Sequence, residues 1–369
     1  MEIKEQENPV KQILDAINNP NLRVVSACAP STRVSIGEMF GMEVGQNLKG
    51  KLVTALKRLG FDDVFDLNFA ADLTIMEEAS ELAERLKSGK NLPHLTSCCP
   101  AWVKYVEKFY PEFIQNLSTT KSPQQIFGAI VKTYYAEKLK ISPDNLFVVC
   151  IMPCLAKRLE RLKKGINVSS ALDVDAVLTV REFGDLLKSK NIDFSKLPDT
   201  PFDQTFNMAS GGGVIFGTSG GVLESALRSL NAKLDKNSIK GLDYQINRGL
   251  DGIKEAEIYI GDRKIKVALA SGLNNAKILL ERLKSGEKFD FIEVMACAGG
   301  CVNGTGMPLY PKEFNKIPLV KKRAKGLYDT DLKEKIKKAN DNKQIQNLYK
   351  SFLLAPNSDI AKQILHVKR

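Results

Sequence analysis

The stretch Leu95-Thr96-Ser97-Cys98-Cys99-Pro100-Ala101-Trp102 decides how the rest of the chain is interpreted. Its two adjacent cysteines stand where an apolar run stops at a proline, and the only tryptophan of the chain follows at once. Two further cysteine motifs lie far downstream, Met152-Pro153-Cys154 and Met295-Ala296-Cys297-Ala298-Gly299-Gly300-Cys301. Because five of the seven cysteines fall in these three motifs, the sequence predicts that the fold brings them to one site.

Length and composition limit the classes of protein to consider. With 369 residues, 43% of them hydrophobic, the chain can bury a large core, and no apolar run reaches the roughly 18 residues of a membrane helix. The polar N-terminus MEIKEQENPVK lacks the apolar core of a signal peptide, so we expect a cytoplasmic protein without a membrane partner. The formal charge of +11 suits an acidic partner, but scattered lysines favour a solvated surface over nucleic-acid binding.

Apolar runs alternate with amphipathic patterns along most of the chain. This alternation predicts the α/β class with mainly parallel sheets. We expect strands at 22–29, 64–69, 146–152, 176–180 and 289–296, a hairpin at 257–269, and helices at 45–59, 74–87, 102–109, 155–164, 183–188 and 222–230.

The predicted domain organisation is simple. Residues 1–21 are expected to form a polar lead-in with a short helix, and 22–369 a single domain whose end, 318–369, is a lysine-rich helical wrap. The glycine-rich segment 211–221 lacks the lysine of a phosphate-binding loop, so we expect a loop that approaches the site closely through its backbone.

The cysteine motifs follow the carboxyl ends of predicted strands, where open α/β sheets bind their ligands. Thiolates suit iron–sulfur clusters, and one four-iron cluster could use Cys99, Cys154, Cys297 and Cys301. Spacing alone leaves buried structural cysteines as an equal alternative. A zinc site is less favoured because five clustered cysteines exceed the need of one zinc ion, and the only histidines, His94 and His366, would contribute little.

Three motifs carry a resemblance to a known family. TSCCPAW at 96–102, MPCLAKRLE at 152–160 and EVMACAGGCVNG at 293–304 resemble the signature segments of the catalytic domain of [FeFe]-hydrogenases. The similarity extends through APSTR at 29–33, ADLTIMEEASEL at 71–82, KSPQQIFG at 121–128 and RGLDGIKEAE at 248–257. The resemblance implies two lobes with the active site in the cleft between them. It also implies reversible reduction of protons to H2.

The resemblance implies a cofactor and its ligands. The family's H-cluster is a [4Fe–4S] cubane joined to a two-iron subcluster with CO, cyanide and azadithiolate ligands. By position, Cys99, Cys154, Cys297 and Cys301 match the cubane ligands, and Cys301 matches the bridging thiolate. The positions that match the pocket around the two-iron unit are Pro30, Ser31, Pro123, Gln124, Met152, Lys157, Phe216 and Met295. Taken alone, the two methionines would be interpreted as ordinary core.

The same resemblance implies a proton route. Cys98 matches the family's relay thiol, and a thiol can carry a proton between solvent and a buried metal. Glu78 and Glu81 lie one helical turn apart and match the route's carboxylates, with Ser118 between them and Arg85 at the outer end. Without the resemblance, acids on an amphipathic helix are expected to be solvated.

The chain departs from the family's pattern in the third motif. Thr305 and Met307 stand where glycine and glutamine are usual, and Ala298 stands where proline is frequent. Threonine does not readily take positive φ, so we expect an altered loop under the bridging ligand. The chain also matches a minimal form without accessory ferredoxin-like domains. Electrons are then expected from an acidic ferredoxin or another redox subunit, and the two-iron unit from maturation enzymes.

Two other functions remain open at this point: a slow, H2-sensing regulatory relative, and a non-catalytic iron–sulfur assembly protein of the same fold. Sensors often alter the relay, whereas Cys98, Glu78 and Glu81 are all present here. Assembly proteins tend to lose the two-iron pocket, whereas Met152 and Lys157 are retained. The sequence therefore favours a catalytic hydrogenase.

Overall fold

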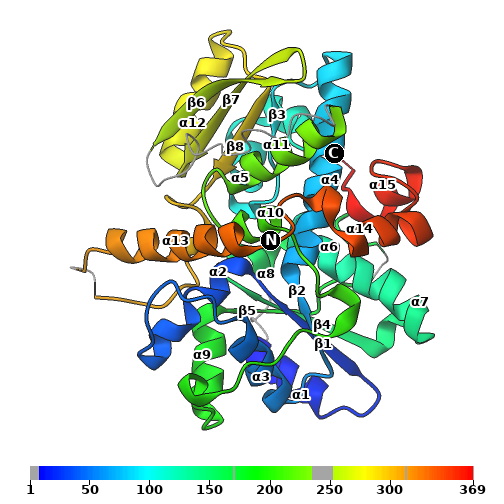
Figure 1. Cartoon of the computed structure of the whole chain (residues 1–369), viewed down its shortest axis with the longest axis vertical. Coiled ribbons are helices and arrows are strands. Elements are labelled where there is room, and N and C mark those ends of the chain that lie inside the picture. The colour runs from blue at the N-terminus through cyan, green and yellow to red at the C-terminus, as the bar shows by residue number, and fades with distance from the viewer. Residues whose placement is uncertain (1–7, 169–170, 235–251, 312–313, 369) are drawn as a thin grey trace.

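A computed structural model describes residues 8–168, 171–234, 252–311 and 314–368. The first four residues of the expected motif at 248–257 lie outside these described residues. Two lobes, each built on a four-stranded sheet, stand one above the other (Figure 1). The α/β class and the mainly parallel sheets predicted from the sequence are therefore confirmed.

The sheet of the first lobe is entirely parallel. Its order is β2 (Asp63–Asp66), β1 (Arg23–Cys28), β4 (Leu146–Met152) and β5 (Ala176–Thr179). Alternate residues of β1 and β4 face two separate apolar clusters, as the two-residue repeat of a strand requires. Helices cover both faces, so these strands are buried apolar runs.

Two groups of helices cover the first sheet. On one face lie α1 (Pro9–Ile17), α3 (Lys49–Leu59) and α9 (Val180–Ser189). On the other lie α6 (Pro123–Ile130) and the first half of α4 (Leu67–Ser88). The expected polar lead-in thus contains a helix that belongs to this lobe, because Ile13 of α1 is fully buried in the core.

The second sheet is mixed. Its order is β3 (His94–Leu95), β8 (Phe291–Met295), β7 (Arg263–Ser271) and β6 (Ile253–Ile260), and only the β6–β7 hairpin is antiparallel. One face packs on α5 (Pro100–Phe109) and α12 (Leu273–Lys284), and the other on α11 (Gly221–Leu234) and the second half of α4.

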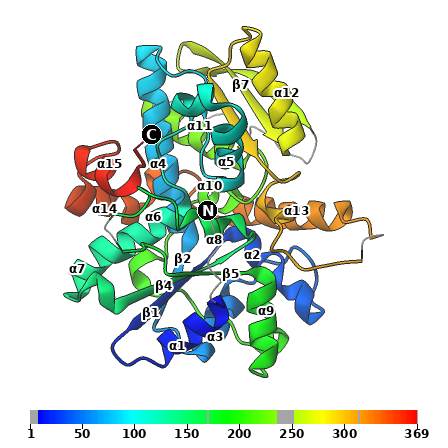
Figure 2. The same ribbon diagram turned by 180° about the vertical axis from the view of Figure 1, so that it is seen from behind.

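Helix α4 therefore belongs to both lobes. Its 22 residues span about 33 Å, and Figures 1 and 2 show it running from the first lobe into the second. Leu67 and Leu73 pack in a core of the first lobe, whereas Leu82 and Leu86 pack in a core of the second lobe. Side chains on its middle turns consequently lie where the two lobes meet.

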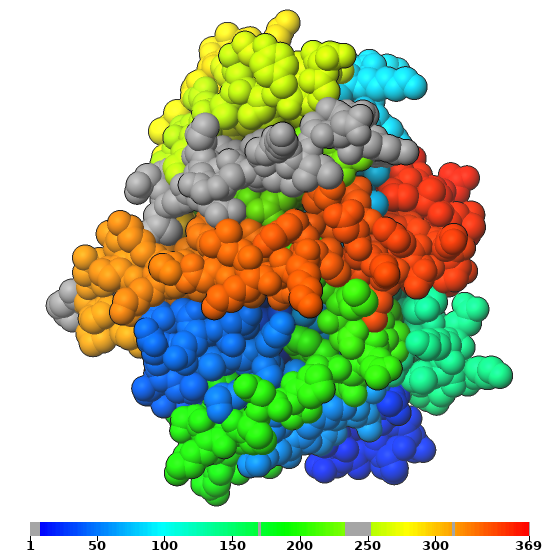
Figure 3. Space-filling model, viewed as in Figure 1, coloured from blue at the N-terminus to red at the C-terminus, as the bar shows by residue number. Residues whose placement is uncertain are grey.

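Three α-helices, joined by short turns of other helix types, form the described end of the chain. Helix α13 (Ile317–Lys333) crosses the molecule between the lobes (Figure 3). Helices α14 (Lys343–Leu348) and α15 (Asp359–Leu365) pack on the core of the first lobe through Leu348 and Leu365. The π-helical turn after α14 adds Leu353, and Phe352 lies at the edge of this core.

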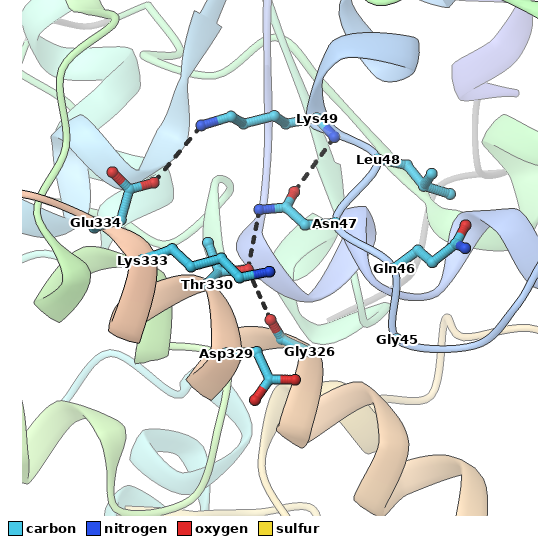
Figure 4. A pocket seen from close by; sticks show the side chains of 10 residues that line it. All are labelled: Gly45, Gln46, Asn47, Leu48, Lys49, Gly326, Asp329, Thr330, Lys333 and Glu334. Carbon is cyan, nitrogen blue, oxygen red and sulfur yellow. Dashed lines mark hydrogen bonds and ion pairs between the residues drawn. The ribbon is translucent and has the colours of Figure 1, made fainter.

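A hollow of about 530 Å³ separates α13 from the chain before α3 (Figure 4). Asn47 Nδ2 donates to Thr330 Oγ1 across it at 3.2 Å, and Lys49 pairs with Glu334 at 3.6 Å. Beside it, a Cβ built on Gly326 would lie 1.9 Å from the carbonyl oxygen of Gly45, so only glycine permits this approach. These contacts join the C-terminal helices to the first lobe.

Three local predictions are wrong. The strand predicted at 64–69 ends at Asp66, because the Asp66 side chain accepts from the Asn68 N–H and caps α4. The helix predicted at 155–164 is the short α8 (Ala156–Glu160). The predicted glycine-rich loop begins with a helix, α10 (Gly211–Ile215), because Ser210 caps it. Among the described helices, none has the length and apolar character to cross a membrane.

We predict that the buried Arg33–Asp66 pair stabilises the junction of β1 with its following loop. Arg33 Nη2 lies 2.5 Å from Asp66 Oδ1 and also donates to the Cys28 carbonyl. Arg33→Met should lower the free energy of unfolding by about 3–5 kcal/mol, because it leaves a buried carboxylate unpaired. Urea unfolding of the purified protein measures the change.

The control is Lys284→Met, which breaks the Lys284–Glu112 pair, whose two side chains are 49% and 46% exposed. That loss should stay below about 1 kcal/mol because solvent screens the pair. An equal loss of unfolding free energy in the two variants would contradict the stabilising role of the Arg33–Asp66 pair.

Candidate active site

The ends of strands from both sheets converge on one cavity. Pro30 follows β1, Cys98 follows β3, Cys154 follows β4 and Met295 ends β8. Each predicted pocket residue lines this cavity, together with the relay thiol and three of the four predicted ligands; these are Pro30, Ser31, Cys98, Cys99, Pro123, Gln124, Met152, Cys154, Lys157, Phe216, Met295 and Cys301. The structure thus brings together residues that the sequence spreads over more than 270 positions.

The fourth predicted ligand, Cys297, lies beside the other three. Burial, together with the nearby thiols of Cys99 and Cys154, raises the pKa of Cys297 to about 12. Burial and the other three cysteines likewise raise the pKa of Cys301 well above its ordinary value. Four thiolates at such close quarters repel one another, so they would need bound metal to compensate their charge.

Among the described residues, no group of three side chains is arranged to hold a single metal ion. A four-iron cluster places each thiolate on a different iron, so its ligands stand further apart than those of one ion. The all-sulfur donor set also matches iron–sulfur chemistry. The four cysteines therefore fit a cluster better than a zinc ion.

Two buried polar atoms in the cavity wall lack a hydrogen-bond partner among the described residues: Ser31 Oγ and Gln124 Oε1. Such atoms cost free energy unless something bonds to them. The rest of the wall is mainly apolar, with Phe216 and Met295 packed against Cys98 and Cys301. An apolar cavity with a few unsatisfied polar atoms fits a compact group with small polar ligands.

Lys157 supplies the cation of the cavity, and its position is fixed on two sides. Its Nζ donates to the Cys98 carbonyl and to Glu160 Oε2, both at 2.9 Å. Glu160 also accepts from Ser122 Oγ at 3.0 Å, and Gln124 Nε2 donates to the Lys157 carbonyl at 2.9 Å. Burial alone would lower the pKa of Lys157, but the Glu160 charge raises it above its ordinary value.

The predicted proton route is a buried chain of hydrogen bonds. Ser118 Oγ lies 2.8 Å from an oxygen of Glu78 and 2.8 Å from an oxygen of Glu81. Arg85 Nη2 donates to Glu81 at 2.6 Å. Both acids are buried, so the expectation that they would be solvated without the resemblance does not hold. Both acids point toward β3 and the segment that begins at Ser118.

The inner end of this chain lies near Cys98. Burial raises the pKa of Cys98 well above its ordinary value, and the Glu78 charge contributes in the same direction. At the outer end, Glu81, Arg85 and Thr119 line a hollow of about 260 Å³ that opens to solvent. Burial tends to raise the pKa of Glu81, but the charges of His94 and Arg85 and the Ser118 hydrogen bond lower it to about 2.

The altered third motif is not strained. Gly300 has φ +91° and a Cβ on it would lie 2.6 Å from the Ser219 nitrogen, so glycine is required there. Thr305 is not among the described residues with positive φ, so the backbone reason for expecting an altered loop disappears. The Thr305 Oγ1 accepts from the Leu155 N–H at 3.4 Å. Met307 packs in the apolar cluster between the first sheet and the helices α1, α3 and α9.

Sequence reasoning missed three charged or titratable side chains of this region. His94 Nε2 bonds Glu78 Oε1 at 2.9 Å, His366 bonds Glu77 at 2.9 Å, and Glu160 holds Lys157. Only Glu160 had a sequence signal, because it lies three residues after Lys157 on one helix. The remaining cysteines, Cys28 and Cys150, are buried core residues as expected.

Comparison with known proteins identifies the family. A model of the C-terminal domain of the iron-only hydrogenase large subunit matches residues 22–305, and one of the iron hydrogenase small subunit matches 316–368. The chain belongs to the iron-only hydrogenase family. It is 43% identical over 98% of its length to iron hydrogenase 1 of Clostridium pasteurianum, of which it spans only 64%.

Three further matches range from 41% to 31% identity. Identity is 41% to the periplasmic [Fe] hydrogenase large subunit of Nitratidesulfovibrio vulgaris, over 92% of this chain and 80% of the relative. An apo [FeFe]-hydrogenase structure from Chlamydomonas reinhardtii superposes with a TM-score of 0.87 at 35% identity, covering 98% of both chains. A probable cytosolic Fe-S cluster assembly factor of Dictyostelium discoideum is 31% identical over 94% of this chain and 75% of that protein.

We predict that the ligand cysteines and the core cysteines behave differently on reconstitution. Anaerobic addition of iron and sulfide to the wild-type apoprotein should give about four irons per chain. Cys297→Ala should retain much less iron, because only three thiolates remain to hold it. Iron and sulfide assays with the visible absorption spectrum measure the difference.

Cys28→Ala is the matched control, since Cys28 is buried in the core of the first lobe. It should retain as much iron as the wild type. A full cluster in Cys297→Ala would contradict the ligand assignment.

Proposed function

We propose that this chain is an [FeFe]-hydrogenase that catalyses 2 H⁺ + 2 e⁻ ⇌ H2. The observation that carries the proposal is the buried route through Glu78, Ser118 and Glu81, which leads from a hollow open to solvent toward the cysteine-lined cavity. A structural iron–sulfur site has no need of such a route, whereas proton reduction does.

The H-cluster is the cofactor of this proposal, and when bound it supplies the metal that exchanges electrons with protons and H2. Cys99, Cys154, Cys297 and Cys301 would hold the cubane, and Cys301 would also bind the two-iron unit. Lys157 Nζ, Ser31 Oγ and the backbone near Pro30 would bind its cyanide ligands. Met152, Met295 and Phe216 would exclude water, since their side chains are apolar. Pro123 and Gln124 complete the wall.

Ser118 is suited to pass protons because its hydroxyl has one hydrogen and two acidic neighbours. The Ser118 oxygen lies 2.8 Å from one carboxylate oxygen of Glu78 and 2.8 Å from one of Glu81. When both acids are ionised it can donate to only one of them. A proton arriving on Glu81 lets that acid donate to Ser118 while Ser118 donates to Glu78. Glu78 then gains the proton and can deliver it toward Cys98.

Arg85 holds the outer acid in place. Its guanidinium donates to Glu81 and to three backbone carbonyls, those of Asn91, Asn116 and Leu117. This keeps Glu81 ionised and aligned with Ser118, so the proton resides there only transiently. His94 positions Glu78 from the other side through its own hydrogen bond.

The catalytic proposal is better supported than its alternatives. A sensor of low turnover would not need a buried chain of carboxylates and a hydroxyl, such as Glu78, Ser118 and Glu81 form here. The matched assembly factor is also less similar to this chain than the matched hydrogenases are. The cavity also keeps the polar atoms and the lysine that suit a two-iron unit. We infer that maturation enzymes supply this unit.

The electron donor in this proposal is an acidic ferredoxin or another redox subunit. Leu155, Leu159 and Leu162 are each about half exposed and follow Cys154 closely, one on α8 and one just beyond each of its ends. Lys163 and Lys164 follow them. A small apolar surface beside basic residues suits a transient complex with an acidic protein close to the cubane cysteines.

We also propose that the reaction takes place in the cytoplasm. All seven cysteines are unpaired in the structure, as is usual in a reducing compartment.

We predict that Glu78→Gln and Cys98→Ala each abolish most H2 turnover while leaving the loaded cofactor intact. Removing a positioned proton carrier should cost about 10²–10⁴-fold in rate. The test loads each purified protein with the two-iron unit, records its infrared spectrum and assays H2 evolution with a reduced dye. CO and cyanide bands should match those of the wild type.

The control is Asp185→Asn, an exposed acid on α9 outside the cavity and the hollow, which should keep nearly full activity. Absence of CO and cyanide bands in the loaded wild type would overturn the hydrogenase proposal. Full activity in Glu78→Gln would overturn only the route.

We predict that charge reversal near the exposed leucines affects the protein donor and not the dye. Lys164→Glu should raise the KM for a reduced acidic ferredoxin several-fold at low salt, because steering by opposite charge is lost. The dye-driven rate should not change. Parallel assays at low and high ionic strength provide the measurement, and an unchanged KM at low salt would exclude this surface.

A further inference from the structure

The end of the chain is paired with the segment that carries the central hydroxyl of the proton route. The Lys121 N–H donates to the Leu365 carbonyl, and the Val367 N–H donates to the Thr119 carbonyl, both at 2.8 Å. These bonds place His366 opposite Thr120 in a short antiparallel bridge. Ser118 lies at the beginning of the paired segment, so the C-terminal segment borders the proton route directly.

Both ring nitrogens of His366 form hydrogen bonds. Its Nδ1 lies 2.8 Å from Thr119 Oγ1, and its Nε2 lies 2.9 Å from Glu77 Oε2. Glu77 is fully buried and also accepts from the Tyr349 hydroxyl and from the Asn357 N–H. Because this carboxylate acts as an acceptor throughout, a neutral His366 carries its proton on Nε2 and accepts from the Thr119 hydroxyl.

Thr119 connects this histidine to the outer acid of the route. Its backbone N–H donates to both carboxylate oxygens of Glu81, at 3.0 and 3.2 Å. His366 and Thr119 both line the 260 Å³ hollow through which Glu81 meets solvent. A displacement of Thr119 would therefore move the donor that orients Glu81 toward Ser118.

We propose that His366 is a positioning residue of the proton route, which holds Thr119 against Glu81 and whose protonation slows proton transfer through Glu81. The proposal rests on the hydrogenase function proposed above. It assigns a role in the reaction to the C-terminal segment, which otherwise only packs on the first lobe.

The charges around His366 determine the direction of the pH effect. Glu77, Glu81 and Arg85 face it from α4, and Lys362 lines the same hollow from α15. Protonation at Nδ1 turns this atom into a donor, so the Thr119 hydroxyl must rotate to accept. It also adds a positive charge near Glu81, and that charge lowers the pKa of Glu81. Turnover should consequently fall on the acid side as His366 becomes charged.

Two substitutions separate position from charge. His366→Gln can still donate to Glu77 and accept from Thr119, but it does not titrate. His366→Ala loses both contacts. Lys368→Met is the control, since Lys368 is an exposed cation two residues further along.

The first measurement is amide hydrogen exchange at Thr119, Thr120 and Lys121 in the apoprotein, which requires neither cofactor nor turnover. Exchange should be about tenfold faster in His366→Ala and unchanged in His366→Gln and Lys368→Met. The second measurement is the pH profile of dye-driven H2 evolution by the loaded proteins. His366→Gln should keep the neutral rate and lose the acid-side decline of the wild type, because a glutamine side chain does not become charged in acid. His366→Ala should be slower at every pH.

Unchanged exchange in His366→Ala, or a wild-type pH profile in His366→Gln, would overturn the proposal. A loaded wild type without H2 turnover would instead overturn the hydrogenase function itself. The two failures are therefore distinguishable.

Discussion

The meeting of strand ends from two sheets at one cavity is the constraint on which the rest of the structure depends. The four predicted ligands come together in and beside that cavity only if the loops after β3, β4 and β8 are short and closely packed. Glycines make this packing possible: a Cβ on Gly304 would lie 2.4 Å from the Pro153 carbonyl oxygen, so the third loop rests on the second. The donor set is therefore assembled by tertiary structure, because no local run of sequence contains it.

Helix α4 meets a second requirement, which is to keep acids buried where both lobes meet. Glu77, Glu78 and Glu81 would each be costly to bury without partners. Each instead accepts several hydrogen bonds, from His366, Ser118 and Arg85 among others. Glu77 ties the helix to the C-terminal segment, whereas Glu78 and Glu81 belong to the proposed proton route. One helix thus both packs in the two lobes and carries the acids of the proposed route.

Much of the fold followed from local pattern. Apolar runs predicted β1, β4, β5 and β8 closely, because buried parallel strands leave a continuous apolar signal. Helix α10 was missed because its glycines disfavour helix, and the cap at Ser210 together with close approach to α4 outweighs that preference. The lining of the cavity was predicted through the resemblance. His94 and His366 were not, because their partners lie 16 and 289 positions away and no periodic pattern joins them.

The central claim is that Cys99, Cys154, Cys297 and Cys301 together hold one four-iron cluster with a two-iron unit beside it. Anomalous diffraction at the iron edge from crystals of the loaded protein tests this most directly. The account predicts four irons bonded to these four sulfurs and two more on the side of Cys301, within the cavity that Lys157 and Met295 line. Iron bound by other side chains, or a cluster that leaves Cys297 unbonded, would contradict it.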